Sequence, residues 1–187
     1  MMTYREQVRA LVEEVTSALQ SVDPDALGSL KQAILDAPRV FVAGMGRSGL
    51  YMRAFAMRLM HLGLPVYVVG DVTTPGIAES ELLLIGSGSG GTASLVQYAQ
   101  RAKALNARVA LISTALTSPI GDQSDCTIVI SAPTPKRDDG DGLFSIQPMG
   151  SLFEQSLGLL LDILVLQLMA DLSVDAGQMF SRHANLE

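Results

Sequence analysis

Cysteine is almost absent from this 187-residue sequence, in which Cys126 is the single one. One thiol excludes an internal disulfide framework, and such sparing use is typical of proteins in a reducing compartment. Residues 1–6 also lack the apolar core of a secretory signal. We therefore expect a cytoplasmic protein.

Positive charge is also scarce, since 13 Lys and Arg residues face 19 Asp and Glu residues, for a formal net charge of −6. This balance provides no global basic field that would attract nucleic acid or an anionic membrane. A phosphorylated ligand must then be bound locally, by backbone N–H groups and a few basic side chains. We expect a small-molecule partner and neither a nucleic acid nor a membrane.

Long hydrophobic runs are limited to residues 157–170, although hydrophobic residues make up 48% of the chain. The run is shorter than the roughly 20 residues that span a bilayer, and Asp162 lies in its middle. A helix that is apolar on most sides is usually buried in a core or between subunits. The run predicts a core helix that also contributes to an oligomer interface.

Histidine occurs only at positions 61 and 183. No Cys, His and Asp residues share a metal-ligand spacing, and there is no G-x-S-x-G nucleophile motif. The sequence therefore predicts neither a metal site nor a Ser-His-Asp hydrolase. His61 ends an apolar helical pattern, where a histidine commonly interacts with the helix dipole, and His183 lies in a polar tail.

The order of patterns predicts one α/β domain over residues 1–187. Residues 3–21 and 24–36 form N-terminal helices, with Asp23 as cap and Pro24 at the first helical position, and residues 38–187 form the core, the C-terminal helix and the tail. Short apolar strands then alternate with helices, at 40–43, 65–69, 81–85, 108–113 and 127–130. This alternation predicts a doubly wound, five-stranded parallel sheet of order 2-1-3-4-5 with helices on both faces.

A loop rich in glycine and hydroxyl groups, 86–92, follows the third strand and precedes a helix expected at 93–105. Glycines expose backbone N–H groups, and the helix directs the positive end of its dipole to the same place. The hydroxyl donors are Ser87, Ser89 and Thr92, with Gly88 between them. Because the lysine of the nucleotide-binding P-loop is missing, the loop favours a phosphate monoester over a triphosphate.

A second glycine loop, 44–49, follows the first strand and precedes a helix expected at 50–62. It fits G-x-G-x-x-G, and Asp71 follows the next strand, so a dinucleotide site is the main alternative. Two features count against it: Ser48 can donate to a ligand, and the third strand has its own phosphate-type loop. Ligands of such sheets bind at the switch point, here between strands 1 and 3, where both loops meet.

Two further features remain open from the residues alone. Residues 132–144 predict a mobile loop or flap, in which Lys136 and Arg137 are either solvated charges or phosphate ligands. Residues 151–154 fit the capping box S-x-x-E at the start of the long C-terminal helix. Glu154 then either serves only the cap or acts as a general base, because a carboxylate can carry a proton between adjacent sugar carbons.

With these motifs assembled, the chain resembles a sugar isomerase (SIS) domain and, within that superfamily, the 6-phospho-3-hexuloisomerase family. The resemblance spans nearly the whole chain and is carried by residues 44–49, 54–63, 73–75, 86–90, 147–155 and 182–187. The block Gln147–Gln155 and the ending Arg182–Glu187 are the most specific of these.

The resemblance implies an isomerase that interconverts D-arabino-3-hexulose 6-phosphate and fructose 6-phosphate in the ribulose monophosphate route of formaldehyde fixation. It implies no redox or metal cofactor, and a homotetramer with sites near subunit contacts. A non-catalytic SIS module that senses a sugar phosphate is the alternative, although no helix-turn-helix pattern precedes the domain.

The site hypothesis assigns three roles. Glu154 is the base, and His183 or His61, from the same or a neighbouring subunit, moves protons between O2 and O3. Ser48, Ser87, Ser89 and Thr92 hold the phosphate. Gly46, Arg47 and Gly88 complete the substrate loops.

Overall fold

A computed structural model describes residues 2–134 and 144–186 of the chain. Two helices come first, α1 (Tyr4–Gln20) and α2 (Pro24–Asp36), close to their predicted bounds. Asp23 caps α2 as expected, because its Oδ1 accepts the Asp25 N–H at 3.0 Å and Pro24 occupies the first turn.

The predicted sheet is confirmed, with five parallel strands in the order β2-β1-β3-β4-β5. The strands are β1 (Val40–Gly44), β2 (Val66–Val68), β3 (Leu82–Gly86), β4 (Arg108–Ser113) and β5 (Cys126–Val129). In the register of the central strands, Leu84 of β3 lies between Val42 of β1 and Ala110 of β4. β3 is apolar throughout because a central parallel strand is buried on both faces.

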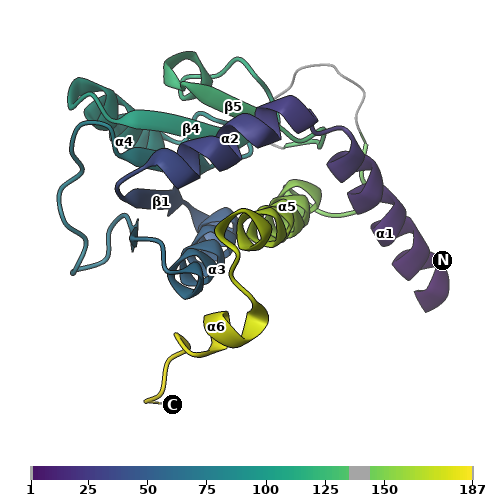
Figure 1. Ribbon diagram of the computed structural model, residues 1–187. Coiled ribbons are helices and arrows are strands. Elements are labelled where there is room, and N and C mark those ends of the chain that lie inside the picture. Colours follow the sequence, from purple (N-terminus) through teal and green to yellow (C-terminus); the bar gives the residue numbers. More distant parts are fainter. Residues whose placement is uncertain (1, 135–143, 187) are drawn as a thin grey trace.

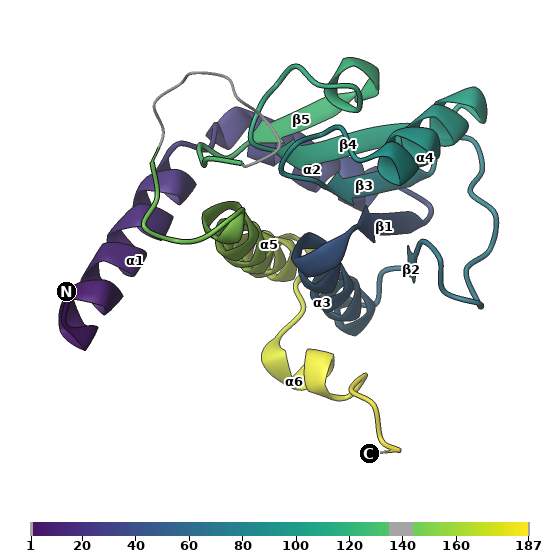
Figure 2. The ribbon, with the colours of Figure 1, turned by 180° about the vertical axis from the view of Figure 1, so that it is seen from behind.

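Helices cover both faces of the sheet (Figures 1 and 2). Leu82 and Leu84 of β3 pack into the core formed with α2, α3 (Gly46–Leu62) and α5 (Ser151–Leu172). Leu83 and Ile85 face the other way, toward α4 (Ala93–Ala104). The alternation of side chains along one strand thus builds two separate cores.

α5 is the predicted core helix. Its inner side, which includes Leu157, Leu160 and Leu164, is buried, and the helix lies beside α3 in both views. Within the described residues it is the one helix long and apolar enough to cross a membrane, with half of its apolar window buried inside the chain. Leu159, Ile163 and Leu166 are exposed and form an apolar stripe on its outer side.

Both ends of the chain extend from the body of the fold (Figure 1). α1 packs on α5 near its end at Val15 and Ala18, whereas Val8 and Val12 of its predicted apolar face are exposed. A short helix that the sequence analysis did not predict, α6 (Ala176–Phe180), follows α5 and contacts α3.

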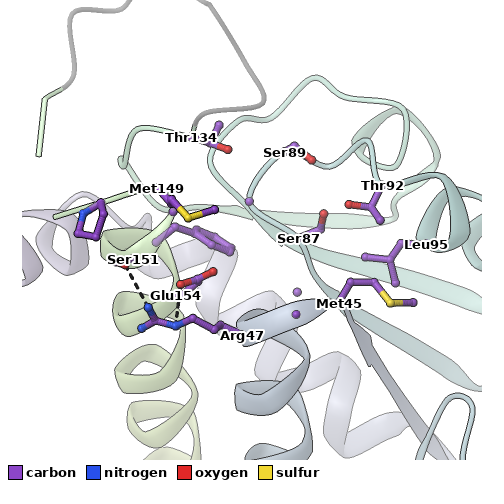
Figure 3. A pocket seen from close by; sticks show the side chains of 16 residues that line it. Met45, Arg47, Ser87, Ser89, Thr92, Leu95, Thr134, Met149, Ser151 and Glu154 are labelled. Carbon is purple, nitrogen blue, oxygen red and sulfur yellow. Dashed lines mark hydrogen bonds and ion pairs between the residues drawn. The ribbon is translucent and has the colours of Figure 1, made fainter.

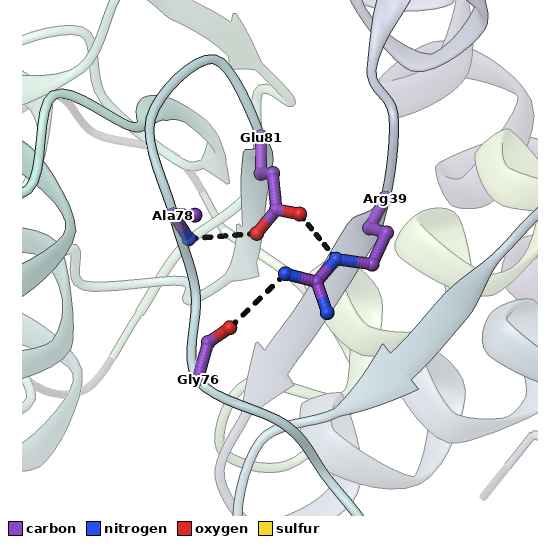
Figure 4. Close-up of polar contacts among 4 residues, drawn as sticks. All are labelled: Arg39, Gly76, Ala78 and Glu81. Carbon is purple, nitrogen blue, oxygen red and sulfur yellow. Dashed lines mark hydrogen bonds and ion pairs between the residues drawn. The ribbon is translucent and has the colours of Figure 1, made fainter.

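An ion pair joins the amino ends of β1 and β3, whereas the glycine loops follow the carboxyl ends of these strands (Figure 4). Buried Glu81 accepts from the Arg39 Nε–H and, at 2.7 Å, from the Ala78 N–H, while Arg39 also donates to the Gly76 carbonyl at 3.3 Å. This buried carboxylate therefore stabilises the amino ends of β1 and β3 and the loop before β3.

The start of one helix differs from prediction. α3 begins at Gly46 rather than Leu50, because the positive φ of Gly46 (+57°) lets the chain enter the helix directly after β1. Between β4 and β5 the chain forms a single 3₁₀ turn, η1 (Gly121–Gln123).

Candidate active site

A cavity of about 430 Å³ opens at the carboxyl ends of β1 and β3, the predicted switch point. Its walls come from the loop after β1, the loop after β3 and the first turn of α5 (Figure 3). The lining residues are Met45, Gly46, Arg47, Gly86, Ser87, Gly88, Ser89, Thr92, Leu95, Thr134, Pro148, Met149, Gly150, Ser151, Phe153 and Glu154. The volume lies in the range of small-molecule sites.

Side chains at the end of β4 hold the loop after β3 in place. The Gly88 carbonyl accepts from the Ser113 hydroxyl at 3.0 Å and from the Thr114 hydroxyl at 2.8 Å. Thr92 is the N-cap of α4, but its side chain forms no capping hydrogen bond. The first N–H groups of α4 and the Thr92 hydroxyl are therefore available to an anion, as a phosphate site requires.

The loop after β1 brings α3 against the end of the strand. A Cβ on Gly49 would lie 2.6 Å from the Gly44 carbonyl oxygen, so only glycine permits this approach. The same turn places Gly46 and Arg47 in the cavity wall. The G-x-G-x-x-G motif thus serves close packing of strand and helix here.

Glu154 lies in the cavity, but the predicted capping box is wrong. α5 starts at Ser151 with Gly150 as N-cap, and no side-chain cap forms. Instead, Glu154 Oε2 is 3.0 Å from Arg47 Nε, and Arg47 Nη1 donates to the Ser151 hydroxyl at 3.1 Å (Figure 3). The packing of α3 against α5 brings the arginine within reach and replaces the local cap.

The structure gathers seven of the ten predicted site residues around this cavity. They are Gly46, Arg47, Ser87, Gly88, Ser89, Thr92 and Glu154. Ser48 is buried in the first turn of α3 and does not line the cavity. His61 and His183 lie at the far end of α3, about 22 Å from Gly46 by the helix rise.

The two histidines, treated separately in the sequence analysis, contact each other. Their rings stack with centroids 5.4 Å apart, and Phe180 of α6 stacks on His183 at 5.9 Å. Arg182 Nη1 donates to the His61 carbonyl at 2.8 Å, which satisfies one of the last carbonyls of α3. Burial, together with Arg58 and His183, lowers the pKa of His61 from 6.5.

Several residues that line the cavity were not predicted as site residues. Ser151 was assigned only to a cap, and Phe153 is a core side chain that packs against Gly88. Met149 is a non-glycine residue with a positive φ of +57°, exposed at the rim of the cavity. Pro148 and Gly150, which stand just before a helix, are the sequence signals from which this turn could be predicted.

Three further expectations concern Asp71, a metal site and the proposed flap. Asp71, the acid of the dinucleotide alternative, is exposed and pairs with Arg53 at 2.7 Å outside the cavity. Across the described ranges, no three His, Cys, Asp or Glu side chains lie close enough to hold a metal ion. The proposed flap with Lys136 and Arg137 falls mostly on residues 135–143, outside the described residues.

Comparison with known families agrees with this geometry. Residues 33–157 match the family model described as SIS domain. The match covers the whole sheet, both glycine loops and the first turns of α5. The chain therefore belongs to the SIS-domain family.

Individual relatives are more specific. The chain is 42% identical to a 3-hexulose-6-phosphate isomerase from Bacillus subtilis over 97% of its own length and 98% of that protein. It is 43% identical to one from Mycobacterium gastri, over 94% of this chain and 87% of that protein. Within the SIS family, the chain is thus grouped with proteins named 3-hexulose-6-phosphate isomerase.

A solved structure extends this grouping to three dimensions. A hypothetical protein from Methanococcus jannaschii, for which a function of 3-hexulose-6-phosphate isomerase was inferred, has a TM-score of 0.84 and 32% identity to the chain. The alignment covers 97% of this chain and 99% of that one.

Proposed function

We propose that this chain is an isomerase that interconverts D-arabino-3-hexulose 6-phosphate and fructose 6-phosphate. The observation that carries the proposal is the position of Glu154, which shares one cavity with the hydroxyl-lined loop of Ser87, Ser89 and Thr92. The loop suits the phosphate, and the carboxylate lies near enough to act on the sugar carbons. The named relatives support the same reaction.

The chemistry requires only proton transfers. Glu154 removes the C2 proton of the 3-ketose, the carbonyl oxygen O3 takes up negative charge, and a cis-enediolate forms. A proton then moves from O2 to O3, and Glu154 returns its proton to C3, which leaves the carbonyl at C2. No hydride acceptor enters this balance, so we expect no redox cofactor.

Ring opening concerns one direction only. In the 3-ketose, O6 carries the phosphate, and closure through O5 would form a strained four-membered ring. Fructose 6-phosphate, in contrast, cyclises and must be opened before its C3 proton can be removed. We expect the site to bind both sugars in the open-chain form.

We assign the proton shuttle between O2 and O3 to His61 or His183 of a neighbouring subunit, because within one chain these residues lie at the far end of α3 from Glu154. Such an arrangement requires an oligomer, and we propose a homotetramer. The exposed apolar stripe of Leu159, Ile163 and Leu166 on α5 offers a surface for subunit contact. We place the enzyme in the cytoplasm, in the ribulose monophosphate route of formaldehyde fixation.

The test is the variant Glu154→Gln, which keeps the size of the side chain and removes the base. 3-Hexulose 6-phosphate, made from formaldehyde and ribulose 5-phosphate, is supplied, and the formation of fructose 6-phosphate is followed. We expect kcat to fall by about 10²–10⁴-fold. Glu79→Gln, an exposed acid at the opposite edge of the sheet, is the matched control and should keep full turnover.

Two measurements separate the alternatives. The wild-type protein should exchange the C3 hydrogen of fructose 6-phosphate for deuterium in D₂O, as seen by NMR. A sugar-phosphate sensor would bind fructose 6-phosphate without this exchange. Full turnover of a folded Glu154→Gln protein would overturn the assignment of the base.

A further inference from the structure

Arg47 lies between the first turns of two helices. It projects from the start of α3 and contacts Glu154 and Ser151, both in the first turn of α5 (Figure 3). Its guanidinium has five N–H donors in one plane, one of which donates to Ser151, while its Nε lies 3.0 Å from Glu154 Oε2. The side chain is 51% exposed and lines the cavity, so the other donors can reach a bound molecule.

The position of this charge opposes local helix preference. Cations are unfavourable at a helix N-terminus, yet Arg47 is the second residue of α3, whose first turn contains no acid. Glu154, in contrast, is at the favourable end of α5. A residue placed against a local preference is expected where function requires it.

Several positive charges border the cavity near Arg47. The N-termini of α3, α4 and α5 all border the cavity, through Gly46, Thr92 and Ser151. Each contributes a partial positive charge, and Arg47 adds a full one. Glu154 supplies the compensating negative charge as long as it remains ionised.

We propose that Arg47 holds Glu154 in place as the base and then stabilises the negative charge that develops on the substrate oxygen O3 when Glu154 becomes neutral. The inference rests on the proposed isomerisation. When Glu154 takes the C2 proton, the electrons of that C–H bond form the C2–C3 double bond, and O3 gains the charge. Glu154 becomes neutral, and the guanidinium donates to the enediolate oxygen. The charge returns to Glu154 when it delivers the proton to C3.

The test compares Arg47→Gln with Arg47→Lys. Loss of the charge should lower kcat by about 10²–10³-fold, as for other donors to a developing oxyanion, while KM changes less than about threefold. Lys keeps a point charge without the planar fork of donors, so the kcat of Arg47→Lys should be about tenfold higher than that of Arg47→Gln. The rate of deuterium exchange at C3 of fructose 6-phosphate should fall in parallel with kcat.

Arg53→Gln is the matched control. It removes an arginine from the same helix and breaks a comparable ion pair, with Asp71, outside the cavity. Its kcat should equal that of the wild type. Ser151→Ala removes the second anchor of Arg47 without a change of charge and should lower kcat by less than tenfold.

A double-mutant cycle decides whether Arg47 acts through Glu154. If it does so in part, Arg47→Gln combined with Glu154→Gln should lose less activity than the product of the two single losses, and the loss that remains comes from the direct contact with the enediolate oxygen. Independent, multiplicative losses would overturn the proposal, as would a raised KM with unchanged kcat in Arg47→Gln. If Arg47→Gln does not fold, Arg47→Lys and Ser151→Ala carry the test, and wild-type kcat in both would overturn it. Failure of the base assignment is distinct, because it appears in Glu154→Gln alone.

Discussion

Glu14 of α1 holds the segment that leads into the cavity wall. Its carboxylate accepts from the Ser145 hydroxyl at 2.7 Å, the Ile146 N–H at 2.7 Å and the Gln147 side-chain amide at 3.0 Å. The next residues, 148–150, line the cavity and form the turn that starts α5. We predict that Glu14→Ala destabilises the fold and loosens this turn.

The magnitude follows from the three contacts. A hydrogen bond to a charged acceptor contributes about 1.5–3 kcal/mol. Because Glu14 is only half-buried, we take about half of that for each bond, so Glu14→Ala should lower the free energy of unfolding by roughly 2–4 kcal/mol. For a chain of this length, the melting temperature should fall by roughly 4–16 °C. Glu14→Gln retains one acceptor oxygen and should lose about half as much.

The same contacts predict a pH dependence. Burial raises the pKa of Glu14, but the hydrogen bonds from Ser145, Ile146 and Gln147 outweigh it and hold the pKa below 4.5. A depressed carboxyl pKa stabilises the fold above the unfolded-state value, and this contribution is lost as the pH falls through the folded-state value. The difference between wild type and Glu14→Ala should therefore shrink below about pH 4.5.

The assay is thermal unfolding by circular dichroism, combined with turnover at a temperature where both proteins are folded. Glu13→Gln, an exposed neighbour on α1, is the control and should melt with the wild type. We also expect a lower kcat for Glu14→Ala, because the turn before α5 carries part of the cavity wall. A Glu14→Ala protein that melts and turns over like Glu13→Gln would refute the reasoning.

Three further predictions concern other parts of the fold. The lowered pKa of His61, caused by burial and neighbouring cations, means that the unfolded state binds protons more readily, so stability should fall as the pH drops below 6.5. The free energy of unfolding, measured by urea titration at several values from pH 5 to 8, should depend less on pH in His61→Gln than in the wild type. The same pH dependence in both proteins would contradict this. Gly158→Ala would place a Cβ 2.5 Å from the Tyr51 ring, so overpacking should cost about 1–3 kcal/mol in chemical denaturation. Leu166→Lys on the exposed stripe should reduce the mass measured by light scattering if α5 forms subunit contacts, and an unchanged oligomer would exclude this surface.

The residues of the cavity could be predicted from the sequence only in part. The loops after β1 and β3 were predicted to meet because the carboxyl ends of neighbouring parallel strands share one edge of the sheet. Ser87, Ser89 and Thr92 were found from their place between a strand and a helix. Ser48 has the same kind of local signal but is buried away from the cavity, because the helix turn decides which side chain faces the ligand.

The sequence by itself determined the architecture of this protein: the capped start of α2, the apolar strands, the alternation that orders the sheet and the position of both loops. These depend on local backbone preferences and on the periodicity of buried residues, which neighbouring residues encode. It also predicted that Glu154 lies in the first turn of the long C-terminal helix.

Only the tertiary structure decided what Glu154 contacts and where the histidines lie. The S-x-x-E pattern predicted a cap, but Arg47, more than one hundred residues earlier, takes the carboxylate because α3 and α5 pack side by side. His61 and His183 meet because α6 returns the chain to the end of α3. Such contacts depend on how helices pack against one another, and no local spacing in the sequence contains that information.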